Sequence, residues 1–139
     1  MASRLRILIA EDNRVLADVM RFNLEAEGFE VTVAHNGQKA LGIAQTECFD
    51  LIISDYQMPG LSGEELLRGI RADSVNTTAV CVLCSAKGYE LDEEQLKDEL
   101  GLHSIVMKPF SPRDLVVLAQ EIETNPGPTG LCATKLVLS

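Results

Sequence analysis

Aromatic residues are scarce in this sequence of 139 residues, and tryptophan is absent. Aromatic side chains make up only 4% of the chain, so a core must be built mostly from aliphatic residues. Hydrophobic residues nevertheless reach 46%, which is a globular composition and not a disordered one. The length suits one domain with a substantial core and is too short for two ordinary domains.

Basic residues are also few. Twelve lysines and arginines stand against 21 aspartates and glutamates, which gives a formal net charge of −9. A chain of this charge repels phosphate groups, so we expect no direct binding to nucleic acid and none to an anionic membrane surface. The excess of carboxylates is compatible with a cation site.

Long apolar runs are missing as well. No stretch is long enough to cross a bilayer. The first apolar run, after Arg6, is interrupted by Glu11 and Asp12, which is unlike a secretory signal peptide. We therefore expect a cytoplasmic protein without a membrane partner.

The four cysteines do not form a convincing redox or zinc motif. Cys81 and Cys84 match C-x-x-C, but a redox dithiol belongs at a helix N-terminus, and these two lie in an apolar run typical of a strand. Residues three apart on a strand point to opposite faces, so we expect two buried structural thiols that do not pair. Cys48 and Cys132 do not complete a zinc site.

Short apolar runs alternate with helical patterns along the chain. Strands are expected over residues 6–10, 29–34, 50–55, 79–84 and 104–107. Helices are expected after the capping residues Asn13, Asn36, Ser62 and Ser111, and over 91–100. Such alternation predicts an α/β fold with a parallel sheet and helices on both faces. The natural candidate is a flavodoxin-like, doubly wound (βα)5 domain with strand order 2-1-3-4-5.

The end of the chain has a different composition. The ordered domain is expected over residues 5–123, followed by a flexible linker and tail over 124–139, which begins with a segment rich in Pro and Gly. Val116 and Val117 widen the apolar arc of the last helix and predict a sticky flank. The acidic helix expected over 91–100 has two interpretations, a solvated surface helix or an acidic docking face.

Polar residues recur where the expected strands end. Glu11 and Asp12 follow the first strand, and Asp55 ends the third. Ser85 follows the fourth strand, and Lys108 follows the fifth. The carboxyl ends of parallel strands share one edge of the sheet, where ligands bind in open α/β folds. Clustered carboxylates repel one another, and Mg²⁺ with its preference for oxygen ligands would relieve that cost. A carboxylate beside Mg²⁺ and Lys108 is a competent nucleophile for a phosphoryl group.

The chain resembles a response-regulator receiver domain of bacterial two-component signalling, of the CheY-like superfamily. The resemblance covers about residues 5–123. It rests on Ile9-Ala10-Glu11-Asp12-Asn13, Ser54-Asp55-Tyr56-Gln57-Met58-Pro59-Gly60, Gly63, Ser85-Ala86 and Lys108-Pro109-Phe110.

The resemblance implies a Mg²⁺ site and a role for each of its residues. Asp12 and Asp55 would contact the metal directly, Glu11 would do so through water, and the backbone carbonyl of Gln57 would be a further ligand. Asp55 would be the phosphoacceptor. The protein would then be no enzyme in the usual sense, since it would assist only its own phosphorylation and dephosphorylation.

The resemblance also implies a switch and a set of partners. Lys108 would bridge to the phosphoryl group, and Ser85 would move toward it. Receivers usually carry Tyr or Phe three residues before this Lys, where this chain has Ile105, so the usual coupling to output is in doubt. The implied partners are a sensor histidine kinase or histidine phosphotransfer protein and a downstream effector, which would contact the fourth helix, fifth strand and last helix. Independently of the resemblance, the apolar flank that Val116 and Val117 give the last helix would allow a phosphorylation-dependent homodimer.

Three other functions compete with this interpretation. A phosphatase of the haloacid dehalogenase type needs a second acid two residues after the nucleophile, where this chain has Gln57. A flavodoxin needs a phosphate-binding loop after the first strand, where Glu11 and Asp12 would repel phosphate. A receiver-like interaction module that is never phosphorylated usually lacks one of the acids or the Lys, and all are present here.

Overall fold

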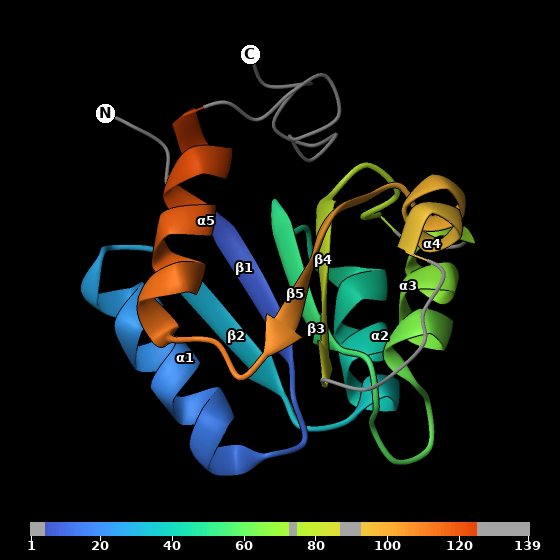
Figure 1. Cartoon of the computed structure of the whole chain (residues 1–139). Helices are drawn as coiled ribbons and strands as arrows, with labels where there is room; N and C mark the ends of the chain where they lie inside the picture. The colour runs from blue at the N-terminus through green and yellow to red at the C-terminus, as the bar shows by residue number, and fades with distance from the viewer. Residues whose placement is uncertain (1–4, 73–74, 87–92, 125–139) are drawn as a thin grey trace.

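The computed structural model of the protein describes residues 5–72, 75–86 and 93–124 (Figure 1). Its strands are β1 (Arg6–Ala10), β2 (Glu30–Ala34), β3 (Leu51–Asp55), β4 (Val80–Ala86) and β5 (Leu102–Lys108). Its helices are α1 (Arg14–Ala26), α2 (Gly37–Thr46), α3 (Gly63–Ala72), α4 (Glu93–Leu100) and α5 (Pro112–Thr124). All strand pairs are parallel, in the order β2-β1-β3-β4-β5. The predicted flavodoxin-like topology is therefore confirmed.

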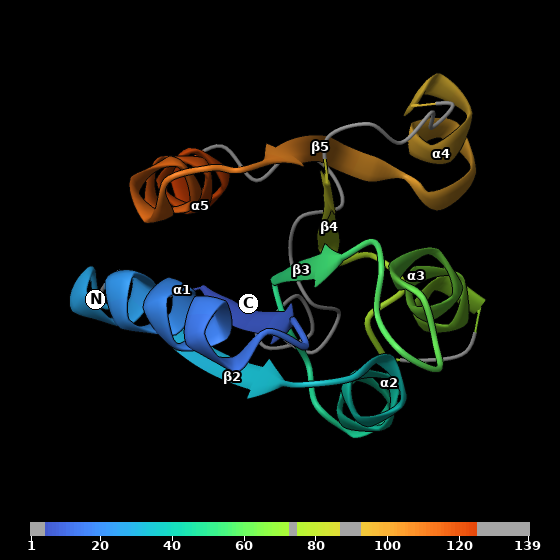
Figure 2. The ribbon, with the colours of Figure 1, turned by 60° about the horizontal axis from the view of Figure 1, so that its bottom comes forward.

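The helices form a layer on each side of the sheet. Figure 2 shows α1 and α5 on one face and α2, α3 and α4 on the other. Side chains alternate between the two layers along each strand, so Ile7 and Ile9 belong to the core under α1 and α5, while Leu8 belongs to the core under α2, α3 and α4. Both cores are mainly aliphatic, as the composition predicts, with Phe29 and Phe49 among the buried aromatic residues.

Strand β3 lies at the centre of the sheet, and all five of its residues are buried. Its neighbours are β1 on one side and β4 on the other. Asp55, the last residue of β3, therefore lies in the middle of the carboxyl edge of the sheet, flanked by the ends of β1 and β4.

The predicted caps hold the starts of several helices. The side chain of Asn13 accepts a hydrogen bond from the backbone N–H of Leu16 (3.0 Å), and that of Asn36 accepts from Lys39 (2.8 Å). Ser62 and Glu65 form the predicted capping box in both directions, at 2.9 and 3.1 Å. These caps fix where the loops after β1, β2 and β3 end.

Several boundaries differ from the sequence prediction. Strand β4 continues through Ala86, and β5 is longer at both ends than 104–107, because the pairing of Cys81–Ala86 with Leu102–Lys108 extends the ladder. Helix α4 begins at Glu93; the residues expected to start it, 91–92, lie outside the described residues. So do residues 125–139, and the predicted boundary between domain and tail stays a prediction.

The flank predicted on the last helix is narrower than expected. Val116 is buried at 2% exposure, so that part of the prediction is wrong, while Val117 is 43% exposed. Val116 faces the core under α1 and α5, which a helix covering a sheet must fill.

Cys81 and Cys84 are buried free thiols in opposite cores, as predicted. Burial raises the pKa of Cys81 to about 11 and that of Cys84 to about 12, so both stay protonated. No helix in the described ranges is long and apolar enough to cross a bilayer.

Candidate functional site

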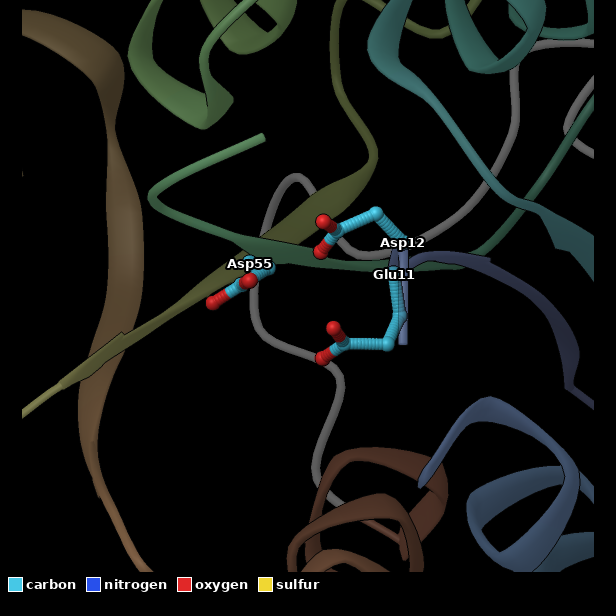
Figure 3. A group of neighbouring side chains, drawn as sticks. All are labelled: Glu11, Asp12 and Asp55. Atoms are coloured by element: carbon cyan, nitrogen blue, oxygen red, sulfur yellow. The ribbon is translucent and has the colours of Figure 1, made fainter. Parts of the chain in front are cut away.

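Three carboxylates meet at the carboxyl edge of the sheet. Glu11 and Asp12 follow the end of β1, and Asp55 ends β3; Figure 3 shows their side chains reaching into one shared space. One oxygen from each lies within 4.8 Å of the others. Glu11 and Asp55 are buried at 2% and 8% exposure, whereas Asp12 is exposed. Among the described residues this is the one group of acids, histidines and cysteines with a spacing suited to a metal ion.

Lys108, at the end of β5, joins two of these acids. Its Nζ lies 3.1 Å from Oε1 of Glu11 and 3.0 Å from Oδ1 of Asp55. The Lys108 side chain is 23% exposed, so its charge is only partly screened by water. A single ammonium group thus bridges the ends of β1 and β3 from the far side of β4.

The protonation equilibria reflect how crowded this site is. Burial, followed by the charge of Asp55, raises the pKa of Glu11. Burial also raises the pKa of Asp55, although its hydrogen bond to Lys108 opposes that shift. Burial alone would lower the pKa of Lys108, but the hydrogen bond to Asp55 and the charge of Glu11 outweigh it, so the pKa is raised. The acids are therefore costly to ionise, and Lys108 stays charged.

The donor set suits a hard divalent cation. Carboxylate oxygens are the preferred ligands of Mg²⁺, which also keeps several waters and needs room for them. A cleft of about 550 Å³ opens beside Asp12, and Tyr56, Gln57, Met58, Pro59 and Ser62 complete its lining. Buried acids of raised pKa gain most from a cation, since it removes their mutual repulsion.

The backbone around Asp55 is closely constrained. The N–H of Tyr56 donates to the carbonyl of Cys84 (2.7 Å), and the N–H of Gly63 donates to the carbonyl of Tyr56 (2.8 Å). A side chain at Gly63 would collide with the backbone carbonyl of Asp55. The start of α3 therefore lies directly against the end of β3 and fixes the direction in which Asp55 leaves the strand.

The structure does not bring every predicted site residue to Asp55. Ser85 is fully buried and its Oγ donates to the carbonyl of Ala86 (3.3 Å). It lies on the same face of the sheet as Leu83, two residues earlier, which belongs to the core under α2, α3 and α4. Asp55 lies on the other face, together with Ile53. Within the described residues, then, Ser85 makes no hydrogen bond to Asp55.

The remaining predicted residues lie near the site in different ways. Gln57 is exposed and lines the cleft beside Asp12. Ile105 is half-buried and packs against the core under α2, α3 and α4. A second, more apolar cleft of about 440 Å³ is lined by Leu16, Ala86, Lys108, Pro109 and Phe110.

Sequence reasoning missed His35. This half-buried residue follows β2, and its Nδ1 lies 3.3 Å from the backbone carbonyl oxygen of Glu11. The only available signal was its place at the carboxyl end of the second strand, directly before the helix cap Asn36.

This fold and this edge of acids with one lysine define a class of protein. Residues 7–120 match the family described as the response regulator receiver domain, and the chain belongs to that family.

The relatives agree with this assignment. The chain is 34% identical over 122 residues to the phosphate regulon transcriptional regulatory protein PhoB of Pseudomonas aeruginosa, covering 88% of this chain and 53% of the relative. It spans about half the length of that curated relative. A CheY-like receiver domain protein from Methanospirillum hungatei superposes with a TM-score of 0.78 at 29% identity, over 88% of this chain and 95% of the other.

A further solved structure is similar in the same way. It is the receiver domain of a sensor histidine kinase from Pseudomonas aeruginosa, with a magnesium ion coordinated in the active site cleft. It has a TM-score of 0.76 and 25% identity, and the match covers 88% of this chain and 100% of that one.

Proposed function

We propose that the protein is a phosphoacceptor receiver domain and that Asp55 takes up the phosphoryl group. The observation that carries the proposal is the position of the Asp55 carboxylate, at the carboxyl edge of the sheet, 3.0 Å from the ammonium of Lys108 and beside two further acids. Membership in the receiver family supports the same role.

The proposed transfer is a simple displacement at phosphorus. An oxygen of the Asp55 carboxylate attacks the phosphorus of a phosphohistidine, a P–O bond forms, and the P–N bond breaks. The bonding electrons leave with the imidazole nitrogen of the donor, and Asp55 becomes an acyl phosphate. Lys108 stabilises the negative charge on the phosphoryl oxygens.

Mg²⁺ is the proposed cofactor. Asp12 and Asp55 would hold it directly, Glu11 through a water, and the Gln57 carbonyl would be a further ligand. When bound it would neutralise charge on the phosphoryl group and on the acids. The solved receiver of a histidine kinase with magnesium in its cleft supports this choice of metal.

The proposed partners follow from the same chemistry. A sensor histidine kinase or histidine phosphotransfer protein would supply the phosphoryl group in the cytoplasm, and residues 5–123 would act as the receiver unit. A downstream effector would contact α4, β5 and α5 after Ser85 and Lys108 are drawn toward the phosphoryl group. Exposed Val117 and Met107 on that face would support a phosphorylation-dependent homodimer.

Intact mass spectrometry tests the proposal. The protein is incubated with Mg²⁺ and a small-molecule phosphodonor, beside an Asp55→Asn variant and a chelated sample. A gain of one phosphoryl group in the wild type alone is the expected result.

Two other results would contradict it. A folded protein that binds Mg²⁺ but gains no mass, even with a phosphorylated histidine donor, would favour an interaction module that is never phosphorylated. A protein that binds no Mg²⁺ would remove the proposed metal site.

A further inference from the structure

The end of β2 holds the peptide that joins Glu11 to Asp12. The N–H of Glu11 donates to the carbonyl of Ala34 at 3.0 Å, which extends the β1–β2 ladder by one bond. His35 then contacts the carbonyl oxygen of Glu11 through Nδ1, at 3.3 Å. The carbonyl of Ala34 thus holds the N–H of Glu11, and the side chain of His35 holds its carbonyl.

The direction of the second bond follows from its chemistry. A carbonyl oxygen can only accept a hydrogen bond, so Nδ1 of His35 must carry the proton and donate it. The imidazole takes the place of the next backbone donor at the point where the strand ladder ends. The orientation of the Glu11–Asp12 peptide therefore depends on a side chain.

The position of the Asp12 carboxylate depends on this peptide more than the positions of the Glu11 and Asp55 carboxylates do. The carboxylate of Glu11 is held by the N–H of Asn13 (3.1 Å) and by Lys108 (3.1 Å), and that of Asp55 by Lys108 (3.0 Å). Asp12 is exposed, and in the part of the chain that the structure describes no donor holds its side chain. Its carboxylate is aimed at the shared space of Figure 3 only by the backbone from which it projects.

We infer that His35 is a positioning residue for the metal site: by donating Nδ1–H to the Glu11 carbonyl, it fixes the peptide that directs Asp12 toward the cation. The inference rests on the proposed function, because it concerns the affinity of the same site for Mg²⁺. Mutating a residue that hydrogen-bonds to a metal ligand typically weakens metal binding by roughly 10–100-fold. A long, neutral bond to a backbone carbonyl should lie below that range, at about three- to tenfold.

The experiment is a Mg²⁺ titration of the whole chain, followed through the backbone amide signals of Asp12 and Asp55 by NMR. His35→Leu removes the donor while keeping an apolar side chain of similar bulk, and we expect the dissociation constant to rise about three- to tenfold. His35→Asn puts its side-chain N–H₂ near the position of Nδ1 and should stay within about twofold of wild type. His35→Gln places the same amide one bond farther out and should resemble His35→Leu.

The second histidine of the chain provides a matched control. His103 is exposed on β5 and contacts the hydroxyl of Ser104, so His103→Leu should bind Mg²⁺ like the wild type. Urea unfolding without metal is measured for every variant, to separate a weaker metal site from a weaker fold. If His35→Leu fails to fold, the comparison of His35→Asn with His35→Gln carries the test.

The outcomes are distinguishable. Weaker binding in the Leu and Gln variants, restored by Asn at equal stability, supports the positioning role. Wild-type affinity in His35→Leu overturns it, and so does equal weakening in the Asn and Gln variants. A wild-type protein that binds no Mg²⁺ refutes the proposed function instead, before any variant is compared.

Discussion

The ionised carboxylates of Asp55 and Glu11 lower the stability of the metal-free protein. Both are buried, and in both burial is the largest cause of a raised pKa. Lys108 contacts both but can neutralise only one negative charge of the three nearby acids. The site therefore stores repulsion that a cation or a proton would release.

We predict that Asp55→Asn stabilises the metal-free protein at pH 7, by on the order of 1 kcal/mol. The folded-state pKa of Asp55 lies above its ordinary value of 3.8, so the folded state binds the proton more tightly than the unfolded chain. The destabilisation by the wild-type carboxylate is thus complete above the folded pKa and absent below 3.8. Urea unfolding should be measured from pH 7 down to below pH 3.8. The difference in free energy of unfolding between Asp55→Asn and the wild type should shrink as the pH falls.

Magnesium and an exposed acid provide the controls. Mg²⁺ should stabilise the wild type through binding to the folded state, and much less so Asp55→Asn. Asp98 is exposed on α4, so Asp98→Asn should leave the unfolding midpoint nearly unchanged. A variant at Asp55 that is less stable than wild type at pH 7 would contradict the argument.

Gly63 offers a steric prediction at the same site. A Cβ atom there would lie 2.9 Å from a methyl carbon of Leu83 and still closer to the carbonyl oxygen of Asp55. Gly63→Ala should therefore lower the free energy of unfolding by about 1–3 kcal/mol. It should also reduce the yield of phosphorylated protein, because the end of β3 must shift. The yield is read by intact mass, and the stability by urea unfolding.

Gly42 is the matched control for this substitution. It lies within α2 with no atom within 4 Å of an added Cβ. Gly42→Ala should be neutral or stabilising by up to about 1 kcal/mol, since Ala is the better helix former. Equal effects of the two substitutions would show that the contact with Asp55 is unimportant.

The acids and the lysine of the site were predictable, whereas their supports were not. Glu11, Asp12, Asp55 and Lys108 were found because parallel strands bring their carboxyl ends to one edge, a rule that needs only the chain order. His35 acts on a backbone carbonyl of a neighbouring strand, a contact that depends on the register between β1 and β2. No residue pattern along the sequence encodes such a partner.

At the scale of elements, Arg71 connects α3 to the C-terminal end of α4 and to the residues just before β4. Its guanidinium donates to the carbonyls of Leu100 (2.7 Å) and Gly101 (3.1 Å), where α4 ends, and to those of Thr77 (2.9 Å) and Ala79 (2.7 Å), before β4 begins. The last carbonyls of a helix have no partner within it, so Arg71 satisfies groups that α4 leaves open.

Arg71→Met should therefore lower the free energy of unfolding by about 2 kcal/mol, because several carbonyls lose a charged donor. Amide hydrogen exchange at the end of α4 and the start of β5 should speed up more than exchange in β1. Arg68→Met is the control one turn earlier on α3. Arg68 pairs with Glu64 and Glu99 at the exposed surface, where ion pairs contribute little, and a large effect there would contradict this comparison.

Connections between elements were the least predictable part of the fold. Asn76, in the connection before β4, is a polar residue that is only 1% exposed. Its amide donates to the carbonyls of Ala44 (2.6 Å) and Glu47 (2.7 Å), and its oxygen accepts from Phe49 N–H (2.6 Å). Periodicity predicts which residues cover a sheet, but not which loop side chain satisfies the end of a distant helix.

At the scale of the whole molecule, the proposed switch has to connect Asp55 with the surface formed by α4, β5 and α5. A phosphoryl group adds roughly −1.5 to −2 charges beside Lys108, the last residue of β5. A phosphoryl mimic such as beryllofluoride, with Mg²⁺, should shift amide signals of residues 93–118 more than those of α2. Asp55→Asn with the same reagents is the control, and unchanged spectra over 93–118 in the wild type would rule out this output surface.

Under the proposed function, Ile105 would determine how that change spreads from β5. It is half-buried against the core under α2, α3 and α4, so a shift of β5 would be transmitted by packing and not by rotation of a ring. Ile105→Ala should therefore reduce the shifts that the phosphoryl mimic causes in α4, while those at Lys108 persist. Met107, on the same face of β5 but 43% exposed, is the matched control, and Met107→Ala should keep the wild-type response in α4. If Ile105→Ala also keeps it, the packing of Ile105 does not couple β5 to α4.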